Sequence, residues 1–207
     1  MKLLFVHGWA LDRTLWRKVI ARLDMGADVI ERDAGYYGRP SHPALPQEPF
    51  LGVGQSLGAL ELLAEPPQGL AGVVSIDGFA RFGQADDFAQ GAPARILARM
   101  KARVADGALG EFLARAGGQV PAGTPDIARL IMGLERLAAL DGRHCALPVW
   151  RLQSEGDPIA PLAVSDASFA GMDVRERHVR PAQDHLSPMH APEACAALIR
   201  TALEALI

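Results

Sequence analysis

Apolar residues in this chain alternate between two patterns. Short continuous runs, as in residues 3–6 and 70–76, are typical of parallel strands that are buried on both faces. Between such runs, apolar residues recur at helical spacing, as in residues 15–23. Strands that alternate with helices predict an α/β fold, a doubly wound parallel sheet of about six strands. The expected strands are residues 3–6, 29–32, 50–53, 70–76, 148–153 and 174–179, and the expected core helices are 15–23, 59–64, 161–170 and 192–206.

Residues 79–143 interrupt this alternation. Apolar residues recur there at helical spacing in three stretches, and no strand-like run lies between them. Thr124 and Pro125 provide a start for the third helix, a cap followed by proline at the first helical position. We therefore expect residues 1–78 and 144–207 to form an α/β core, into which residues 79–143 are inserted as a helical lid.

The connection after the second expected strand lacks a helical pattern. It is rich in proline, and no helix fits between Pro40 and Pro49. This is unusual between parallel strands, because such a crossover normally needs a dozen or more residues and usually carries a helix. The sequence therefore predicts an extended loop before the third strand.

A glycine-rich turn follows that third strand. Its residues, Gly54-Gln55-Ser56-Leu57-Gly58, match G-x-S-x-G between an apolar run and a helix-prone run, which is the context that this motif requires. On so sharp a turn the serine backbone is strained, and a side chain at position 54 or 58 would clash with the neighbouring strand and helix. The helix that follows directs its N-terminal amides to the serine hydroxyl. The five residues alone leave open a structural turn with an incidental serine.

Two further residues lie where a serine nucleophile needs them. Acyl transfer through serine requires a base for the hydroxyl proton, a carboxylate that orients the base, and donors for the oxyanion. In a parallel sheet these groups must lie at the carboxyl ends of the strands, on the edge that carries Ser56. Asp157 follows the fifth expected strand and His185 follows the sixth. The chain order Ser56, Asp157, His185 is that of α/β-hydrolase triads, so we expect these three residues to be catalytic.

Other titratable residues are weaker candidates. His190 also follows the last strand, but it lies deeper in the loop and next to the start of a helix. Asp77 ends the strand after the serine helix and is an alternative carboxylate. Asp184 is expected to face solvent. Three further histidines are interpreted as structural or solvated: His42, His144 and His178.

The oxyanion needs two backbone donors. The residue after the nucleophile supplies one, so the amide of Leu57 is the first candidate. The second should come from the loop after the first strand, where Gly8 permits a close approach and Trp9 carries the amide. Trp9 is alternatively a core aromatic residue, and the two roles are compatible if its indole lies against the acyl chain.

Composition excludes several classes of protein. The chain has 207 residues, enough for one domain with a proper core, and its net charge of −3 argues against nucleic-acid binding. No apolar run is long enough to span a bilayer, and the N-terminal run is too short for a signal peptide. Cys145 and Cys195 lie in unrelated contexts, so free thiols in a reducing compartment are expected. These features predict a soluble, cytoplasmic protein.

We expect neither a metal nor a cofactor. The histidines lack the i, i+4 pairing or the cysteine partners that zinc needs. The glycine-rich turn also differs from the G-x-G-x-x-G fingerprint of dinucleotide-binding proteins. The expected site therefore consists of protein groups alone.

Together these motifs resemble the α/β-hydrolase superfamily, and within it the chain is similar to the pimeloyl-[acyl-carrier-protein] methyl ester esterases of biotin synthesis. The resemblance extends over nearly the whole chain. It implies Ser56 as nucleophile, Asp157 as orienting acid and His185 as base, with the amides of Trp9 and Leu57 as oxyanion donors. The segments that carry it are residues 7–12 with Trp16, Gly38-Arg39, 54–58, 133–137, 147–152, 156–158 and 185–193.

The chain departs from this family in two places. It starts at what corresponds to the third family strand, and the helix that normally precedes the nucleophile strand is reduced to the loop between Pro40 and Pro49. We therefore expect a shortened form of the fold. Either this loop covers one face of the sheet, or the face is exposed locally.

The resemblance also implies a substrate that is carried by an acidic acyl carrier protein. Arg95, Arg99 and Arg103 recur at four-residue spacing and offer such a partner one basic helix face, to which Lys101 and Arg115 add charge. A solvated helix face explains the same residues equally well. One alternative function is a general carboxylesterase or lipase-like hydrolase of small to medium acyl esters. Another is a non-catalytic, hydrolase-like binding protein, against which the intact triad argues.

Overall fold

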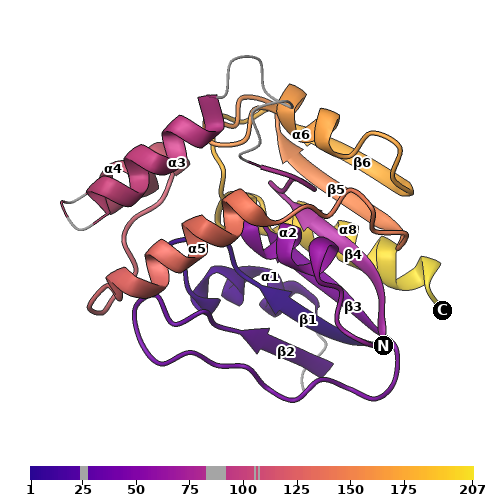
Figure 1. The fold of residues 1–207 in the computed structure, drawn as a ribbon. Coiled ribbons are helices and arrows are strands. Elements are labelled where there is room, and N and C mark those ends of the chain that lie inside the picture. The colour runs from indigo at the N-terminus through magenta and orange to yellow at the C-terminus, as the bar shows by residue number, and fades with distance from the viewer. Residues whose placement is uncertain (24–27, 83–91, 105, 107) are drawn as a thin grey trace.

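The computed structural model describes residues 1–23, 28–82, 92–104, 106 and 108–207, with the backbone alone for residues 92–97. Its centre is a six-stranded sheet in the order β2-β1-β3-β4-β5-β6 (Figure 1). All neighbouring strands are parallel, which confirms the predicted doubly wound sheet. The strands are β1 (Lys2–Val6), β2 (Val29–Arg32), β3 (Phe50–Gln55), β4 (Leu70–Ile76), β5 (Val149–Ser154) and β6 (Val174–Arg180).

Helices cover both faces of this sheet. On one face α1 (Arg17–Leu23) packs against α8 (Pro192–Ala205). On the other face α2 (Leu57–Ala64) lies against β3 and β4. The 3-10 helix η1 (Arg13–Trp16) precedes α1, α6 (Leu162–Ser168) connects β5 to β6, and the short α7 (Ser187–His190) precedes α8.

Side-chain alternation along β1 divides the core between these two faces. Leu3 and Phe5 pack in the cluster that contains Trp16 and the buried residues of α8. Leu4 and Val6 pack in the cluster that contains Leu62 and Leu63 of α2. A strand that is buried on both faces needs an uninterrupted apolar run, which explains why the pattern at residues 3–6 is continuous.

The connection from β2 to β3 contains no helix, as predicted. Asp33 and Ser41 exchange two backbone hydrogen bonds of 2.9 Å, which close the first part of the loop. Leu45 is half-buried and packs against the cluster that includes Leu4 and Phe50. The loop therefore covers part of the sheet face that a crossover helix would otherwise cover.

Between β4 and β5 the described residues form three helices, which we call the lid helices: α3 (Ala92–Arg103), α4 (Ala108–Ala116) and α5 (Ile127–Ala139). The Arg136 side chain ties α5 to the core, because it donates to Glu61 on α2 and to Glu65 directly after it, at 2.6 Å each. The boundaries predicted for an inserted lid, residues 79 and 143, stay a prediction. Every helix in the described parts of the chain is too short or too polar to cross a membrane.

The start of α5 differs from the prediction. The helix begins at Ile127, and the Asp126 carboxylate caps it by accepting the backbone N–H of Arg129 at 3.0 Å. The start expected at Thr124 and Pro125 is therefore wrong by about one half-turn. Aspartate caps a helix at least as well as threonine does, so cap preference does not favour Thr124 over Asp126.

Candidate active site

Ser56 occupies a strained turn between β3 and α2. Its φ of 52° and ψ of −118° lie in a region that L-residues rarely adopt. The two glycines of the motif make the turn sterically feasible. A Cβ at Gly54 would lie 2.4 Å from the backbone nitrogen of Ala59, and one at Gly58 would lie 2.2 Å from the carbonyl oxygen of Val6. The motif thus forms the sharp strand–turn–helix connection that the sequence predicts.

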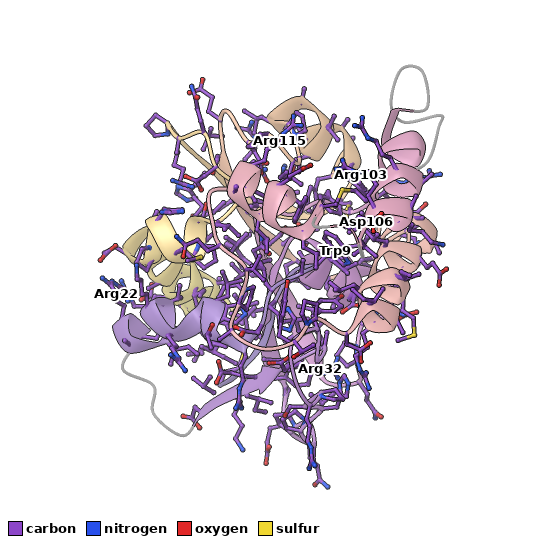
Figure 2. All side chains as sticks on the ribbon, turned by 90° about the vertical axis from the view of Figure 1, so that its left-hand side faces the viewer. Trp9, Arg22, Arg32, Arg103, Asp106 and Arg115 are labelled. Carbon is purple, nitrogen blue, oxygen red and sulfur yellow. The ribbon has the colours of Figure 1, made fainter. Side chains whose placement is uncertain are left out.

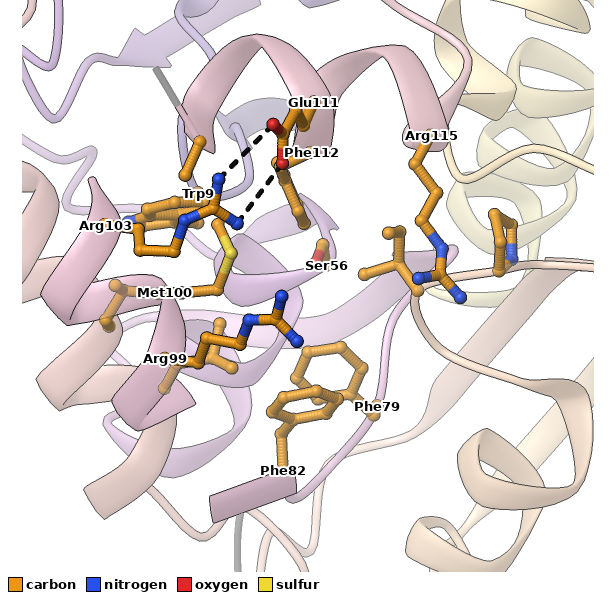
Figure 3. A pocket seen from close by; sticks show the side chains of 15 residues that line it. Trp9, Ser56, Phe79, Phe82, Arg99, Met100, Arg103, Glu111, Phe112 and Arg115 are labelled. Carbon is orange, nitrogen blue, oxygen red and sulfur yellow. Dashed lines mark hydrogen bonds and ion pairs between the residues drawn. The ribbon is translucent and has the colours of Figure 1, made fainter. Parts of the chain in front are cut away.

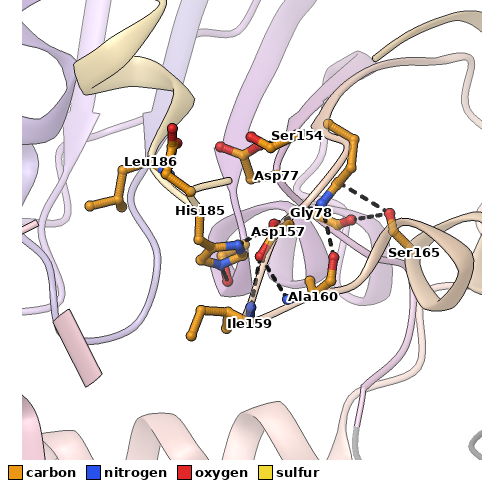
Figure 4. A network of polar contacts seen from close by, with 12 residues as sticks. Asp77, Gly78, Ser154, Asp157, Ile159, Ala160, Ser165, His185 and Leu186 are labelled. Carbon is orange, nitrogen blue, oxygen red and sulfur yellow. Dashed lines mark hydrogen bonds and ion pairs between the residues drawn. The ribbon is translucent and has the colours of Figure 1, made fainter. Parts of the chain in front are cut away.

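Ser56, His185 and Asp157 form one chain of hydrogen bonds. His185 Nε2 lies 2.9 Å from Ser56 Oγ, and His185 Nδ1 lies 2.6 Å from Asp157 Oδ2 (Figure 4). All three residues are buried. Because the Asp157 carboxylate accepts the Nδ1 proton, Nε2 of the neutral ring is the acceptor for the serine hydroxyl. The structure therefore brings together the three residues expected from the sequence, in the orientation that general-base catalysis requires.

Three further donors fix the Asp157 carboxylate. Its Oδ1 accepts the backbone N–H groups of Ile159 (2.8 Å) and Ala160 (2.9 Å), and its Oδ2 accepts the side-chain amide of Gln153 (2.8 Å). Gln153 was not predicted from the sequence, because a glutamine within an expected strand belongs to no motif. The available signal was its position in a buried run, four residues before the candidate acid.

The backbone of His185 is held from two sides. Its N–H donates to the carbonyl of Ala116 at the end of α4 (2.9 Å), and its carbonyl accepts the side-chain amide of Gln55 (2.8 Å). One anchor therefore comes from a lid helix and the other from the strand that leads to Ser56. The position of the imidazole depends on both parts of the structure.

Burial and charge act in opposite directions on the pKa of His185. Desolvation lowers this pKa, but the negative charge of Asp157, its hydrogen bond and the charge of Asp77 outweigh desolvation. The pKa of His185 therefore lies above the ordinary value of an imidazole.

This raised pKa gives a testable pH dependence. We expect kcat/KM for an ester to fall as the pH is lowered through the pKa of His185, because the imidazolium cannot accept the serine proton. Asp157→Asn removes the largest cause of the raised pKa, so the acidic limb should move to lower pH, while the plateau rate falls roughly 10⁴-fold. Asp77→Asn is the comparison: it should cost less rate and move the acidic limb less, because the charge of Asp77 is a smaller cause of the raised pKa. An acidic limb that does not move in Asp157→Asn would assign it to another group.

Asp77 does not orient the imidazole. Its fully buried carboxylate accepts the backbone N–H (2.7 Å) and the hydroxyl (2.8 Å) of Ser187. Both Ser154 donors lie 3.3 Å away, and Figure 4 shows Ser154 beside Asp77. Burial is the main cause that raises the pKa of Asp77 to about 6, whereas the charge of His185 lowers this pKa. Since Ser187 lies two residues after His185, Asp77 anchors the loop that carries the base.

Arg180 extends this anchor to the other side of the base. Its Nε donates to Ser187 Oγ at 2.7 Å, and its guanidinium pairs with Asp184. The expectation that Asp184 faces solvent is therefore wrong: its side chain is 17% exposed and also accepts the N–H of Leu186 at 3.1 Å. The reason is the tight return of the loop after β6, which brings residue 184 back to the strand end.

The other histidines do not reach Ser56. His190 is exposed, and its Nε2 lies 2.8 Å from the carbonyl oxygen of Gly117. His178 is exposed and pairs with Glu176 at 2.8 Å. His42 and His144 are also exposed.

The two proposed oxyanion amides lie at the ends of neighbouring strands. Leu57 is the first residue of α2, and Trp9 follows β1, which pairs with β3 through Val6 and Gly54. Within the described chain, neither N–H donates to a backbone carbonyl, so both can bind a ligand oxygen. The Trp9 side chain belongs to the core, as the alternative role requires: its indole donates to the Leu130 carbonyl at 2.8 Å and packs edge-on against a phenylalanine of α4.

A cavity of about 360 Å³ opens beside Ser56, between the end of the sheet and the lid helices (Figure 3). This volume lies within the range of small-molecule sites. Most of its wall is apolar and comes from both core and lid: Trp9, Phe79, Phe82, Met100, Phe112, Leu134, Leu137 and Ile159. Such a wall suits the apolar part of an acyl chain.

Three arginines line the same cavity. Arg99 and Arg103 belong to α3 and Arg115 belongs to α4. Figure 2 shows Arg103 and Arg115 on the lid helices, near Trp9. Arg103 is paired with Glu111 at 3.3 Å. The Arg95 side chain, the remaining member of the basic face expected from the sequence, lies outside the described residues.

The arrangement is suited to acyl transfer. A hydroxyl that is hydrogen-bonded to a carboxylate-oriented imidazole can lose its proton as it attacks a carbonyl carbon. Backbone amides close to that hydroxyl can stabilise the resulting oxyanion. Among the described residues, no group of three or more His, Cys, Asp or Glu side chains is placed to hold a metal ion.

No family model and no curated protein sequence matches this chain. Solved structures do match it. An esterase from Exiguobacterium antarcticum has a TM-score of 0.78 at 13% identity, over 99% of this chain and 92% of that one. A thermophilic esterase from Thermogutta terrifontis has a TM-score of 0.75 at 20% identity, over 100% of this chain and 90% of that one. An enol-lactonase from Burkholderia xenovorans LB400 has a TM-score of 0.69 at 16% identity, over 98% of this chain and 90% of that one.

At these identities the similarity concerns the fold. It spans nearly the whole of each chain and includes the parallel sheet with helices on both faces. The protein has the α/β-hydrolase fold.

Proposed function

We propose that this protein is a serine esterase, which hydrolyses a carboxylic ester through an acyl-enzyme intermediate. One observation carries the proposal: a continuous chain of hydrogen bonds runs from Ser56 through His185 to Asp157, and Ser56 lines an apolar cavity. A purely binding role would not require this alignment of hydroxyl, imidazole and carboxylate, so the non-catalytic alternative is disfavoured.

The proposed reaction has two halves. Ser56 Oγ attacks the ester carbonyl carbon while its proton passes to Nε2 of His185, and the oxyanion accepts hydrogen bonds from the amides of Leu57 and Trp9. The bond to the alkoxy oxygen then breaks, and this oxygen leaves as the alcohol with the proton from His185. In the second half His185 takes a proton from water, which attacks the acyl group. The acid is released and Ser56 regains its proton.

For the substrate, we propose the methyl ester of a pimeloyl chain on acyl carrier protein. The motifs that resemble that esterase family, the apolar cavity beside Ser56 and the arginines of α3 and α4 support this choice. Acyl carrier protein is acidic, so cationic lid helices would favour the encounter. Rescue of biotin-free growth in a host that lacks its own methyl ester esterase tests the assignment, with Ser56→Ala as the control.

Charge reversal on α3 tests the partner directly. Replacing Arg95, Arg99 and Arg103 by glutamate should lower kcat/KM for the carrier-bound ester by about tenfold or more, since the variant repels an acidic partner. The loss should shrink as salt rises, because exposed charges are screened over about 8 Å at physiological ionic strength. Steady-state rates at two salt concentrations measure this.

The same rates on a short neutral ester serve as the comparison. Its hydrolysis should depend much less on these charges. An equal loss on both esters would indicate a damaged cavity, and no loss on either would argue against a carrier protein as the partner.

A general esterase of small or medium acyl esters is the second candidate. It is favoured by the position of Arg99 and Arg103, which line the cavity itself. Because these side chains line the space beside Ser56, they can contact the substrate itself without a protein partner. This candidate predicts higher kcat/KM for small esters than for the carrier-bound ester, and no rescue of biotin-free growth.

A further inference from the structure

Two of the arginines in the cavity have no ionic partner among the residues that the structure describes. Arg99 on α3 and Arg115 on α4 both line the space that contains Ser56. Figure 3 shows their side chains extending into this space from different helices. Neither guanidinium makes a hydrogen bond or ion pair with any residue that the structure describes. Arg103 differs, because Glu111 neutralises it at 3.3 Å.

The described lining of the cavity is therefore electrically unbalanced. Its charged side chains are three arginines and one glutamate, which leaves a net charge of +2. Two like charges on the wall of one cavity repel each other, and solvent screens this repulsion only in part. An anion between them would remove this repulsion, and the planar fork of a guanidinium matches the two oxygens of a carboxylate.

The two ends of the cavity have different chemistry. Ser56 is buried, with 6% of its surface exposed, so it marks the closed end. Arg99 and Arg115 are exposed, so they lie at the open end. Apolar side chains such as Met100 and Phe112 line the space between them. A molecule that fills this space has a reacting carbonyl, an apolar middle and an anionic end.

We propose that Arg99 and Arg115 form an anion subsite, which selects monoesters of dicarboxylic acids. The ester carbonyl lies at Ser56, the methylene chain packs on the apolar wall, and the free carboxylate binds the two guanidinium groups. This inference deepens the proposed serine-esterase function and rests on it. It assigns Arg99 and Arg115 to direct contact with the substrate in place of the carrier-docking role considered above, so it does not rest on a carrier-bound ester.

The monomethyl and dimethyl esters of one linear dicarboxylic acid test the subsite. The two esters differ in the charge at the distal end of the chain. Because the dimethyl ester has two ester groups, its rate is divided by two. We expect the wild-type protein to prefer the monoester by roughly tenfold in kcat/KM, which is the effect of one or two charge-assisted hydrogen bonds at a partly solvated site. The preference should arise mainly in KM and should shrink as salt rises.

Substitutions at the two arginines locate the effect. The double variant Arg99→Gln/Arg115→Gln should reduce the preference to about one, because no positive charge remains unpaired in the described lining. Arg99→Lys/Arg115→Lys should retain part of the preference, because it keeps the charge and loses the fork. Arg175→Gln is the matched control. Arg175 is exposed, pairs with Asp173 on the far edge of the sheet and does not line the cavity, so its loss should leave the ratio of the two esters unchanged.

Binding to Ser56→Ala separates this inference from the proposed function. Calorimetry should show the monomethyl ester binding more tightly than the dimethyl ester, and the two glutamine substitutions should abolish the difference. If that pattern is found while the wild-type protein hydrolyses neither ester, the subsite stands and the esterase proposal fails. If both esters are hydrolysed without a preference for the monoester, the esterase proposal stands and the subsite is refuted.

A third arm distinguishes a free carboxylate from an anionic carrier. If the arginine substitutions reduce turnover of a carrier-bound ester and leave the ratio of the two free esters unchanged, the arginines serve the carrier protein. That result would overturn the inference. Dependence of the free monoester on both arginines supports it.

Discussion

Replacing Ser56 by alanine is expected to abolish ester hydrolysis while the fold persists. Loss of a triad nucleophile lowers the rate about 10³- to 10⁶-fold. The residual activity comes from substrate binding and the oxyanion donors. Alanine is a matched replacement, because it meets the same steric cost as serine at a φ of 52°. Any loss of activity can therefore be attributed to the missing hydroxyl.

Two measurements complete this experiment. Hydrolysis of a chromogenic ester gives the rate, and thermal unfolding compares the stability of the variant with that of the wild-type protein. If a folded Ser56→Ala protein kept most of its activity, the nucleophile would have to be another residue.

Replacing His185 by alanine should have an effect of similar size. The imidazole both takes the proton from Ser56 and returns it to the leaving alcohol, so both halves of the reaction need it. His190→Ala is the matched control, since His190 lies in the same loop and is exposed. It should keep substantial activity, although it loses the contact with the carbonyl of Gly117. The reverse ranking of the two variants in steady-state kcat/KM would reassign the base.

The sheet and the candidate triad were accessible from the sequence because each leaves a local pattern. A strand buried on both faces requires a continuous apolar run, as in β1, and the sharp turn at Ser56 requires glycine on both sides. Parallel strands then place the residues that follow them on one edge, which brings Asp157 and His185 to Ser56.

What the sequence did not indicate depends on how distant elements pack. Arg99 lies at helical spacing from Arg103, and this spacing is the same whether the shared face points outwards or into a cavity. Only the docking of α3 on the core decides between them. Likewise, the burial of Asp184 depends on its pairing with Arg180. The packing of Leu45 on the sheet depends on the path of a loop that has no regular apolar spacing.

The triad is also spread along the chain in a way that matters during synthesis. Ser56 lies on the third strand to leave the ribosome, whereas His185 follows the last one, 129 residues later. From β3 onwards the strands lie side by side in the sheet in the order in which they occur in the chain. The nucleophile turn can therefore form before its base exists, and a nascent chain would hold a chemically idle serine. Under the proposed mechanism, activity would first appear when β6 has docked and Ala116 and Gln55 hold the backbone of His185.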